Sequence, residues 1–249
     1  MLVQVLLLSV LIGVALGLLG GGGSILTLPI LTYVVGMETK TAIAASLFVV
    51  AVTSATGVVA HARAGRVRWR TGLTFGAAGM VGAYGGGRLA AYVPGTILML
   101  LFALMMVATA LAMLRDRRAP TSTAPRELPV RKVIAEGIVV GVVTGLVGAG
   151  GGFLVVPALV LLGGLGMEFA VGTSLVVISM KSLAGFYGHL DHVHDLDWTI
   201  TLAVTAAAVV GSLVGGRLAG RIPPAVLRKG FGVFVLVMAA FVLTQELAG

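Results

Sequence analysis

The chain has 249 residues, of which 58% are hydrophobic and 10% charged, and its mean hydropathy is +1.10. Because soluble domains carry about a quarter charged residues, this composition excludes an ordinary soluble domain and favours a membrane protein, whose length is counted in spans of about 20 residues. Cysteine is absent, which excludes disulfides and thiolate metal sites, and the formal charge of +8 comes from short gaps between apolar blocks, which is typical of cytoplasmic loops and not of nucleic-acid binding.

The first half of the chain contains five apolar segments. Leu2–Leu19 is long enough to cross a bilayer, and it lacks the positive n-region and cleavage site of a signal peptide, so we expect a retained helix. A glycine run follows, and Ser24–Val35 is then apolar but only about half a bilayer long. Three further segments are predicted as full spans: Thr39–Ala60, Thr71–Ala91 and Gly95–Leu114.

The second half repeats this order after one polar segment. Residues 115–132 are rich in Pro, Ser, Thr and charges, which indicates a cytoplasmic connecting loop between a first transmembrane repeat, residues 1–114, and a second, residues 133–249. The second repeat contains Val133–Val147, a second glycine run, the short segment Phe153–Leu165, and three predicted spans: Phe169–Leu190, Trp198–Ala219 and Ala225–Leu243. We therefore expect an all-α polytopic membrane protein, with about four full spans and one short broken or re-entrant helix in each half.

A duplication explains this order, because identical residues recur at an offset of about 128. The sequence GGRLA occurs at 86–90 and again at 215–219, after one residue of slip. Chance similarity between apolar segments does not reproduce a proline, a histidine and an arginine in the same order. The matched positions include Gly17 with Gly145, Pro29 with Pro157, Ser46 with Ser174, and His61 with His189.

The charges predict that the two repeats are inverted. The gap after Ala60 holds four arginines between Arg63 and Arg70, whereas its counterpart after Gly188, HLDHVHDLDW, is acidic and has no Lys or Arg. By the positive-inside rule, equivalent loops then lie on opposite sides of the membrane. Inversion requires an odd number of crossings in each half, and we expect the short segment after each glycine run to supply the fifth. Both chain ends are then predicted to be extracytoplasmic.

The two glycine runs, in GLLGGGGSILTLPIL from Gly17 and GLVGAGGGFLVVPAL from Gly145, predict helix breaks within the membrane. Such breaks persist only where protein or a water-filled cavity surrounds them, and the following helix offers free N–H groups and a partial positive charge. We expect them to bind an anion at Gly20, Gly21, Gly22, Gly23, Ser24, Gly148, Gly150, Gly151 and Gly152. Other glycines, such as Gly13, Gly17, Gly82 and Gly86, instead have the small-xxx-small spacing that packs helices together.

The glycine motifs, each followed by a span containing AASL or GTSL, together with the repeated GGRLA, make the whole chain resemble the sulfite exporter TauE/SafE family of membrane transporters. This resemblance implies transport of small sulfur-containing or organic anions, such as sulfite, sulfonates or sulfoacetate. It does not indicate which of these anions this chain carries.

Polar residues inside the predicted spans extend the candidate site. Lys181 lies near the middle of Phe169–Leu190, where a cation is costly and usually faces the bundle interior, so we expect it to attract an anion or carry a coupling proton. Five hydroxyls on the two equivalent spans are also candidate donors to an anion, although each could instead bond to its own preceding helical turn: Ser46, Thr53, Thr173, Ser174 and Ser182.

Two alternatives to a secondary transporter remain open at this stage. An anion channel of the same fold would pass anions without alternating access, and a divalent-metal transporter would use the His and Asp residues of the 189–197 loop, although their spacing is not that of a regular metal site. Neither a phosphate-binding loop nor a nucleophile–base pair is visible, so we expect a secondary transporter without cofactor or enzymatic activity. Its expected partners are a small anion and the plasma-membrane bilayer, with homo-oligomerisation possible.

Overall fold

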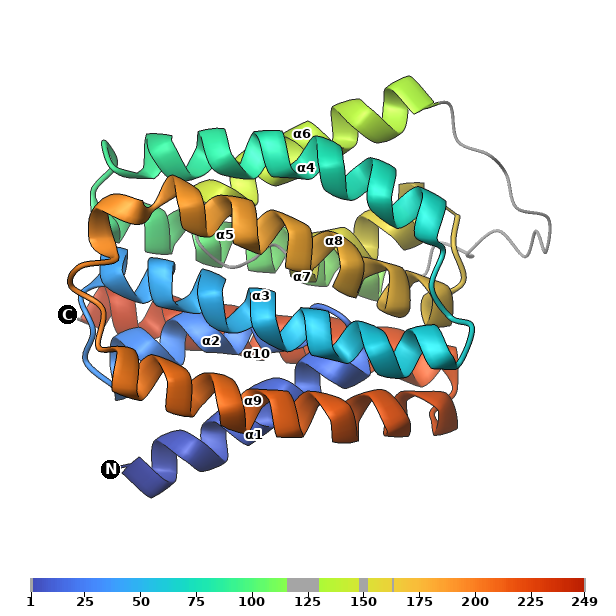
Figure 1. Ribbon diagram of the computed structural model, residues 1–249, viewed down its shortest axis with the longest axis horizontal. Helices are drawn as coiled ribbons and strands as arrows, with labels where there is room; N and C mark the ends of the chain where they lie inside the picture. Colours follow the sequence, from blue (N-terminus) through green and yellow to red (C-terminus); the bar gives the residue numbers. More distant parts are fainter. Residues whose placement is uncertain (1, 116–129, 148–151, 163, 249) are drawn as a thin grey trace.

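The structure, a computed structural model, describes residues 2–115, 130–147, 152–162 and 164–248, which form ten α-helices and no strand (Figure 1). Most of the predicted connecting loop lies outside the described residues, as do the predicted site residues Gly148, Gly150 and Gly151. The helices of the first half are α1 Leu2–Leu19, α2 Gly22–Pro29, α3 Thr39–Arg63, α4 Trp69–Ala90 and α5 Gly95–Leu114. Those of the second half are α6 Val130–Val147, α7 Gly152–Pro157, α8 Met167–Gly188, α9 Trp198–Leu218 and α10 Pro224–Ala248.

Within the described residues, five helices are long and apolar enough to cross a bilayer, namely α3, α5, α8, α9 and residues 225–245 of α10. The hydropathy pattern predicts full spans at Leu2–Leu19 and Thr71–Ala91 as well. Residues 4–19 of α1 form a shorter apolar helix, and α4 is 22 residues long but does not belong to the five. The composition of α4 explains why it is not among the five. Its many glycines and its two arginines, Arg70 and Arg88, lower its mean hydropathy.

Each half places a proline where a short α-helix passes into a π-helical turn. α2 ends at Pro29 and continues as the π-helix Ile30–Val34, and α7 ends at Pro157 and continues as the π-helix Ala158–Leu162. Proline donates no backbone hydrogen bond, and its ring clashes with the carbonyl four residues earlier, so a regular α-helix does not pass through it undisturbed. The repeated proline therefore explains why both short helices widen at the same point.

The first glycine run turns the chain back on itself. A Cβ on Gly23 of α2 would overlap the carbonyl oxygen of Ile12 and the Cβ of Leu16, both on α1. If α2 continued in the direction of α1, Gly23 would lie about 16 Å beyond Ile12 at 1.5 Å per residue. α1 and α2 therefore form a helical hairpin. The expectation that the short helix makes a fifth crossing is wrong for this half, because the hairpin adds no net crossing and leaves three helices, α3 to α5.

Glycines pack two pairs of helices closely in a parallel arrangement. A Cβ on Gly13 would overlap the backbone of Ala208, and one on Gly17 would overlap that of Ser212, so α1 runs parallel to α9. The equivalent pair, α4 and α6, is joined in the same way, with Gly82 against Ile138 and Gly86 against Val142. This confirms the prediction that these glycines serve close helix packing.

The central pair, α3 and α8, runs antiparallel. The Cβ positions of Gly185 and Gly172 on α8 face Leu47 and His61 of α3, so rising numbers on one helix meet falling numbers on the other. The most apolar stretches of these two helices are 67% and 78% buried, against 33% for α10, which places α3 and α8 at the centre. In Figure 1, α3 runs from left to right and α8 from right to left, and both chain termini lie at the left end.

Candidate functional site

The first helix break lies at Gly20 and Gly21, inside the protein. Gly20 has a φ of +72°, a conformation that residues with a side chain adopt only at a cost. Both glycines are buried. A Cβ on Gly20 would lie 2.6 Å from the Oγ of Ser174 and 2.9 Å from the Cα of Val171, both on α8. Protein therefore encloses the tip of the hairpin, as a break within a membrane requires.

The start of α7 meets this tip. A Cβ on Gly152 would lie 2.8 Å from the Cα of Gly21 and 3.0 Å from the Oγ of Ser24. The first residues of α2 and of α7, which are far apart in the sequence, thus lie in van der Waals contact. Each helix start carries N–H groups without an intrahelical partner and a partial positive charge. Their meeting concentrates positive potential at one buried point.

Three of the predicted hydroxyl donors bond to their own helical turn. The Oγ atoms of Ser24, Ser46 and Ser174 donate to the carbonyl oxygens of Gly21, Ile43 and Val171 at 2.7, 2.9 and 2.8 Å. This is the alternative role that the sequence analysis left open for such residues. Ser24 also supports the first turn of α2, since it bonds the carbonyl of the residue that precedes the helix.

The remaining predicted hydroxyls differ in their environment. The Oγ1 of Thr173 accepts a hydrogen bond of 3.0 Å from the backbone N–H of Arg68, which ties α8 to the start of α4. The Oγ1 of Thr53 and the Oγ of Ser54 are buried in α3 without a hydrogen-bond partner among the described residues. Ser182 is fully buried in α8. Thr53 is therefore the predicted hydroxyl with unused hydrogen-bonding capacity, whereas the helix ladder or a neighbouring loop engages the others described above.

Lys181 is buried inside the bundle, with 1% of its surface exposed. Its Nζ donates to the Oγ1 of Thr144 on α6 at 3.1 Å, and Thr144 in turn donates to the carbonyl of Gly141. The lysine stem crosses α4 at Gly79, where a Cβ would lie 2.6 Å from the lysine Cδ. Thr144 lies on the last turns of α6, so the ammonium group is held near the approach to the second glycine run.

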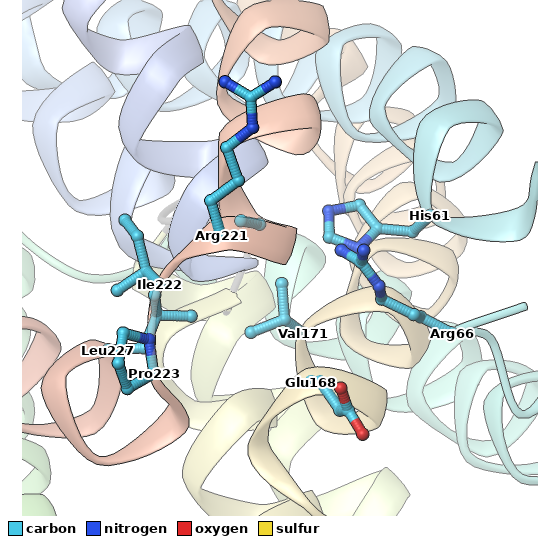
Figure 2. A pocket seen from close by; sticks show the side chains of 9 residues that line it. His61, Arg66, Glu168, Val171, Arg221, Ile222, Pro223 and Leu227 are labelled. Carbon is cyan, nitrogen blue, oxygen red and sulfur yellow. The ribbon is translucent and has the colours of Figure 1, made fainter. Parts of the chain in front are cut away.

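A cavity of about 330 Å³ opens at the end of the bundle where α3, α8 and α9 meet (Figure 2). The sequence pattern does not predict this cavity. Its charged and titratable lining residues come from separate parts of the chain: His61, Arg66, Glu168 and Arg221. Val171 also lines it, and the backbone of Val171 contacts Gly20, so one residue separates the cavity from the first helix break. The available signal was the repeated histidine at the end of a span, next to an arginine-rich gap.

Two acidic residues of the 189–197 loop, Asp191 and Asp197, have structural roles. Asp191 forms an ion pair of 3.1 Å with Arg88, and Asp197 accepts hydrogen bonds from the backbone N–H groups of Thr199 and Ile200, which caps α9. Among the residues that the structure describes, no group of three His, Asp or Glu side chains is arranged to hold a metal ion. This geometry gives no support to the metal-transporter alternative.

Comparison with known sequences places this arrangement in a family. Residues 5–242 match the family described as "Sulfite exporter TauE/SafE", which covers nearly the whole chain. The chain belongs to the TauE/SafE family. A Xylella fastidiosa protein described as "Probable membrane transporter protein" is 35% identical over 245 residues, covering 96% of this chain and 93% of the relative. No solved structure matches the chain.

More distant TauE/SafE-like relatives share the same description. A Methanocaldococcus jannaschii protein is 30% identical over 193 residues, covering 74% of this chain and 72% of the relative. A Bacillus subtilis protein is 27% identical over 250 residues, covering 98% and 97% of the two chains. The resemblance inferred from the glycine motifs is thereby confirmed. The chain is a multi-pass membrane protein of a transporter family and not an enzyme.

Proposed function

We propose that the protein is a secondary transporter that carries a small anion, such as sulfite, a sulfonate, sulfoacetate or a related organic anion, across the plasma membrane by alternating access. The observation that carries this proposal is the contact between Gly21 and the Gly152 position, where the starts of α2 and α7 meet. Helix starts that converge inside a membrane transporter favour negative charge on the substrate. Because Gly21 and Gly152 have no side chains, they do not cover the backbone N–H groups at the two helix starts.

Helix directions support inverted repeats in this mechanism, with residues 1–114 and 133–249 as the two halves and residues 115–132 joining them. α4 runs parallel to α8, since Gly72 faces Thr173 while Gly87 faces Gly185. α3 and α8 are antiparallel, and they are equivalent helices of the two halves. Two inverted halves around one central site are the arrangement that rocking transporters use.

Charge supports an orientation for this bundle. The arginine-rich gap between α3 and α4 and the basic segment between α9 and α10 lie at one end of the bundle, where both line the cavity with Arg66 and Arg221. By the positive-inside rule this end is cytoplasmic, and the two termini, which lie at the other end in Figure 1, are extracytoplasmic.

Lys181 supplies positive charge to the proposed transport path. A buried cation with a neutral hydroxyl as its hydrogen-bond partner is costly in a membrane and is typical of a functional site. An anion that reaches the second break can offset this cost. Thr53 occupies the equivalent position on α3, and its buried hydroxyl has no hydrogen-bond partner among the described residues. The two halves therefore place a cation and a neutral hydroxyl at matching positions.

The test is flux through the purified full-length protein in liposomes. We expect uptake of sulfite or methanesulfonate to saturate with concentration and to show counterflow when the vesicles are preloaded with the same anion. Gly152→Ala, which crowds the meeting point of the two helices, should abolish uptake, whereas Gly85→Ala, with open space around its Cβ position, should not. Uptake that rises linearly and shows no counterflow would favour an anion channel, and an absence of anion flux would refute the proposal.

A further inference from the structure

His61, which lines the cavity in Figure 2, has a buried ring nitrogen without a partner among the described residues. His61 has 1% of its surface exposed, and its Nε2 lies 2.9 Å from the carbonyl oxygen of Gly17 on α1. Because a carbonyl can only accept, Nε2 carries the hydrogen. The other ring nitrogen, Nδ1, is buried without a hydrogen-bond partner among the described residues. Figure 2 shows the ring projecting from α3 toward the other residues that line the cavity.

The charges around this nitrogen favour an anion. Arg66 on the α3–α4 connection and Arg221 on the α9–α10 connection both line the cavity, and the carboxylate of Glu168 in the first turn of α8 opposes them. Two arginines against one glutamate leave a surplus of positive charge while His61 is neutral. A volume of about 330 Å³ holds roughly ten waters at about 30 Å³ each, which is room for a small oxyanion and part of its hydration shell.

The cavity also adjoins the proposed transport site. Val171 lines the cavity and contacts Gly20, and the carbonyl that accepts from His61 belongs to Gly17, on the last turn of α1 before the break. An anion in the cavity would therefore lie one side chain away from the tip of the first hairpin.

At the other end of the bundle, the residues equivalent to those that line the cavity are of different types. Glu168 corresponds to Lys40 under the repeat offset, and Arg221 corresponds to Tyr92. The Nζ of Lys40 donates at 3.0 Å to the carbonyl of Ala91, which links the start of α3 directly to the end of α4. The charged residues that line the cavity at this end are therefore not repeated at the other end.

We propose that this cavity is a second anion site, in which a small oxyanion binds between Arg66, Arg221 and the Nδ1 of His61 before it reaches the helix breaks. This inference rests on the proposed function, since the ligand is the transported anion. A sulfonate group can only accept hydrogen bonds, so Nδ1 must donate to it while Nε2 still donates to Gly17. The ring in the loaded state is therefore an imidazolium, and one proton binds together with the anion.

Two consequences can be measured on purified full-length protein in phosphatidylcholine vesicles, with methanesulfonate as the probe because it stays ionised at all relevant pH values. Affinity should fall as the pH is raised from about 5.5 to about 8, because the anion binds together with a proton on His61. Arg66→Gln and His61→Gln should each weaken binding by on the order of tenfold, as for the loss of one charge-assisted hydrogen bond. His61→Gln should also abolish the pH dependence.

Matched controls separate this site from general effects. His189→Gln removes the equivalent histidine at the other end, and Arg70→Gln removes a basic residue of α4 that does not line the cavity, so both should keep wild-type affinity. Arg66 is partly exposed and its substitution should not prevent folding, so the test does not depend on the buried His61 variant alone. An anionic lipid headgroup shares the ligand chemistry, and one-third phosphatidylglycerol in the vesicles tests for it.

The outcomes distinguish this inference from the proposed function. If the wild type transports methanesulfonate while His61→Gln and Arg66→Gln keep its affinity and pH dependence, the second site is refuted and the transporter proposal stands. Loss of methanesulfonate binding upon addition of phosphatidylglycerol would also overturn it, because the cavity would then be a lipid site. If the wild type carries no anion at all, the proposed function itself fails.

Discussion

Arg88 and Asp191 form an ion pair of 3.1 Å that joins the last turn of α4 to the short helix after α8, at the end of the bundle opposite the cavity. Under the repeat offset the equivalent residues at the cavity end are Arg217 and Arg63, two cations. An ion pair thus links α4 to the segment after α8 at one end, whereas the equivalent two residues at the other end carry like charges and cannot form one. Within the proposed alternating-access cycle, this difference favours the state in which the cavity end is open and the opposite end is closed.

Removing the ion pair between Arg88 and Asp191 should make that end of the bundle more accessible to solvent. Because the two side chains are 53% and 63% exposed, the pair is worth only about 0.2–1 kcal/mol, so Asp191→Asn should increase access by up to about fivefold. The chain has no cysteine, so a single Val193→Cys substitution reports access without further changes. We expect faster labelling of Cys by a membrane-impermeant maleimide in the Asp191→Asn background. The difference should shrink in about 1 M salt, and a difference unaffected by salt would contradict an electrostatic cause.

Glycine-mediated packing of α4 on α6 should be essential for stability. Gly82→Ala would overlap the carbonyl oxygen of Ile138, and we expect a loss of about 1–3 kcal/mol from such overpacking. Gly85→Ala, one turn along the same helix with open space around it, should leave stability unchanged or raise it by up to about 1 kcal/mol. Thermal unfolding in detergent measures both. Equal melting temperatures for the two variants would contradict the close contact.

The positive φ of Gly20 should matter because of its location. Gly20 and Gly36 have φ values of +72° and +80°, but the Cβ position of Gly20 meets Ser174 and Val171 while that of Gly36 meets nothing within 4 Å. Each Gly→Ala substitution carries a backbone cost of about 1–2 kcal/mol. We expect Gly20→Ala to lose anion transport in liposomes and Gly36→Ala to keep it. Retained flux in the Gly20 variant would mean that the hairpin tip has no role in transport.

Lys181 should lower stability while it serves transport. Replacing a buried charge by an apolar side chain of similar length is often neutral or stabilising by about 1–4 kcal/mol. We therefore expect Lys181→Met to unfold at the same or a higher temperature and to lose most of its anion flux. Thr144→Val, which removes the hydroxyl partner and keeps the charge, provides the comparison. A Lys181→Met variant with wild-type flux would show that the lysine is not part of the transport path.

The sequence alone determined that this is a helical membrane protein, that it contains an internal duplication, and where most helices begin and end. Continuous hydrophobic blocks of about 20 residues favour helices in a bilayer, because a helix satisfies all of its backbone hydrogen bonds within one segment. Predicted segments such as Gly95–Leu114 therefore coincide with α5. The repeated glycine runs and the short apolar segments after them likewise placed both short helices, since glycine acts on the backbone locally. The family followed from the same motifs.

Only the tertiary structure decided the direction of the short helix and the contacts of the polar residues. Whether α2 continues or turns back depends on Gly23 packing against Ile12, a contact between two helices that no local pattern encodes. The pairing of Lys181 with Thr144 and the joining of His61, Arg66 and Arg221 around one cavity depend in the same way on how distant helices pack. A hydropathy pattern fixes which segments are buried together, but side-chain packing fixes which residues meet.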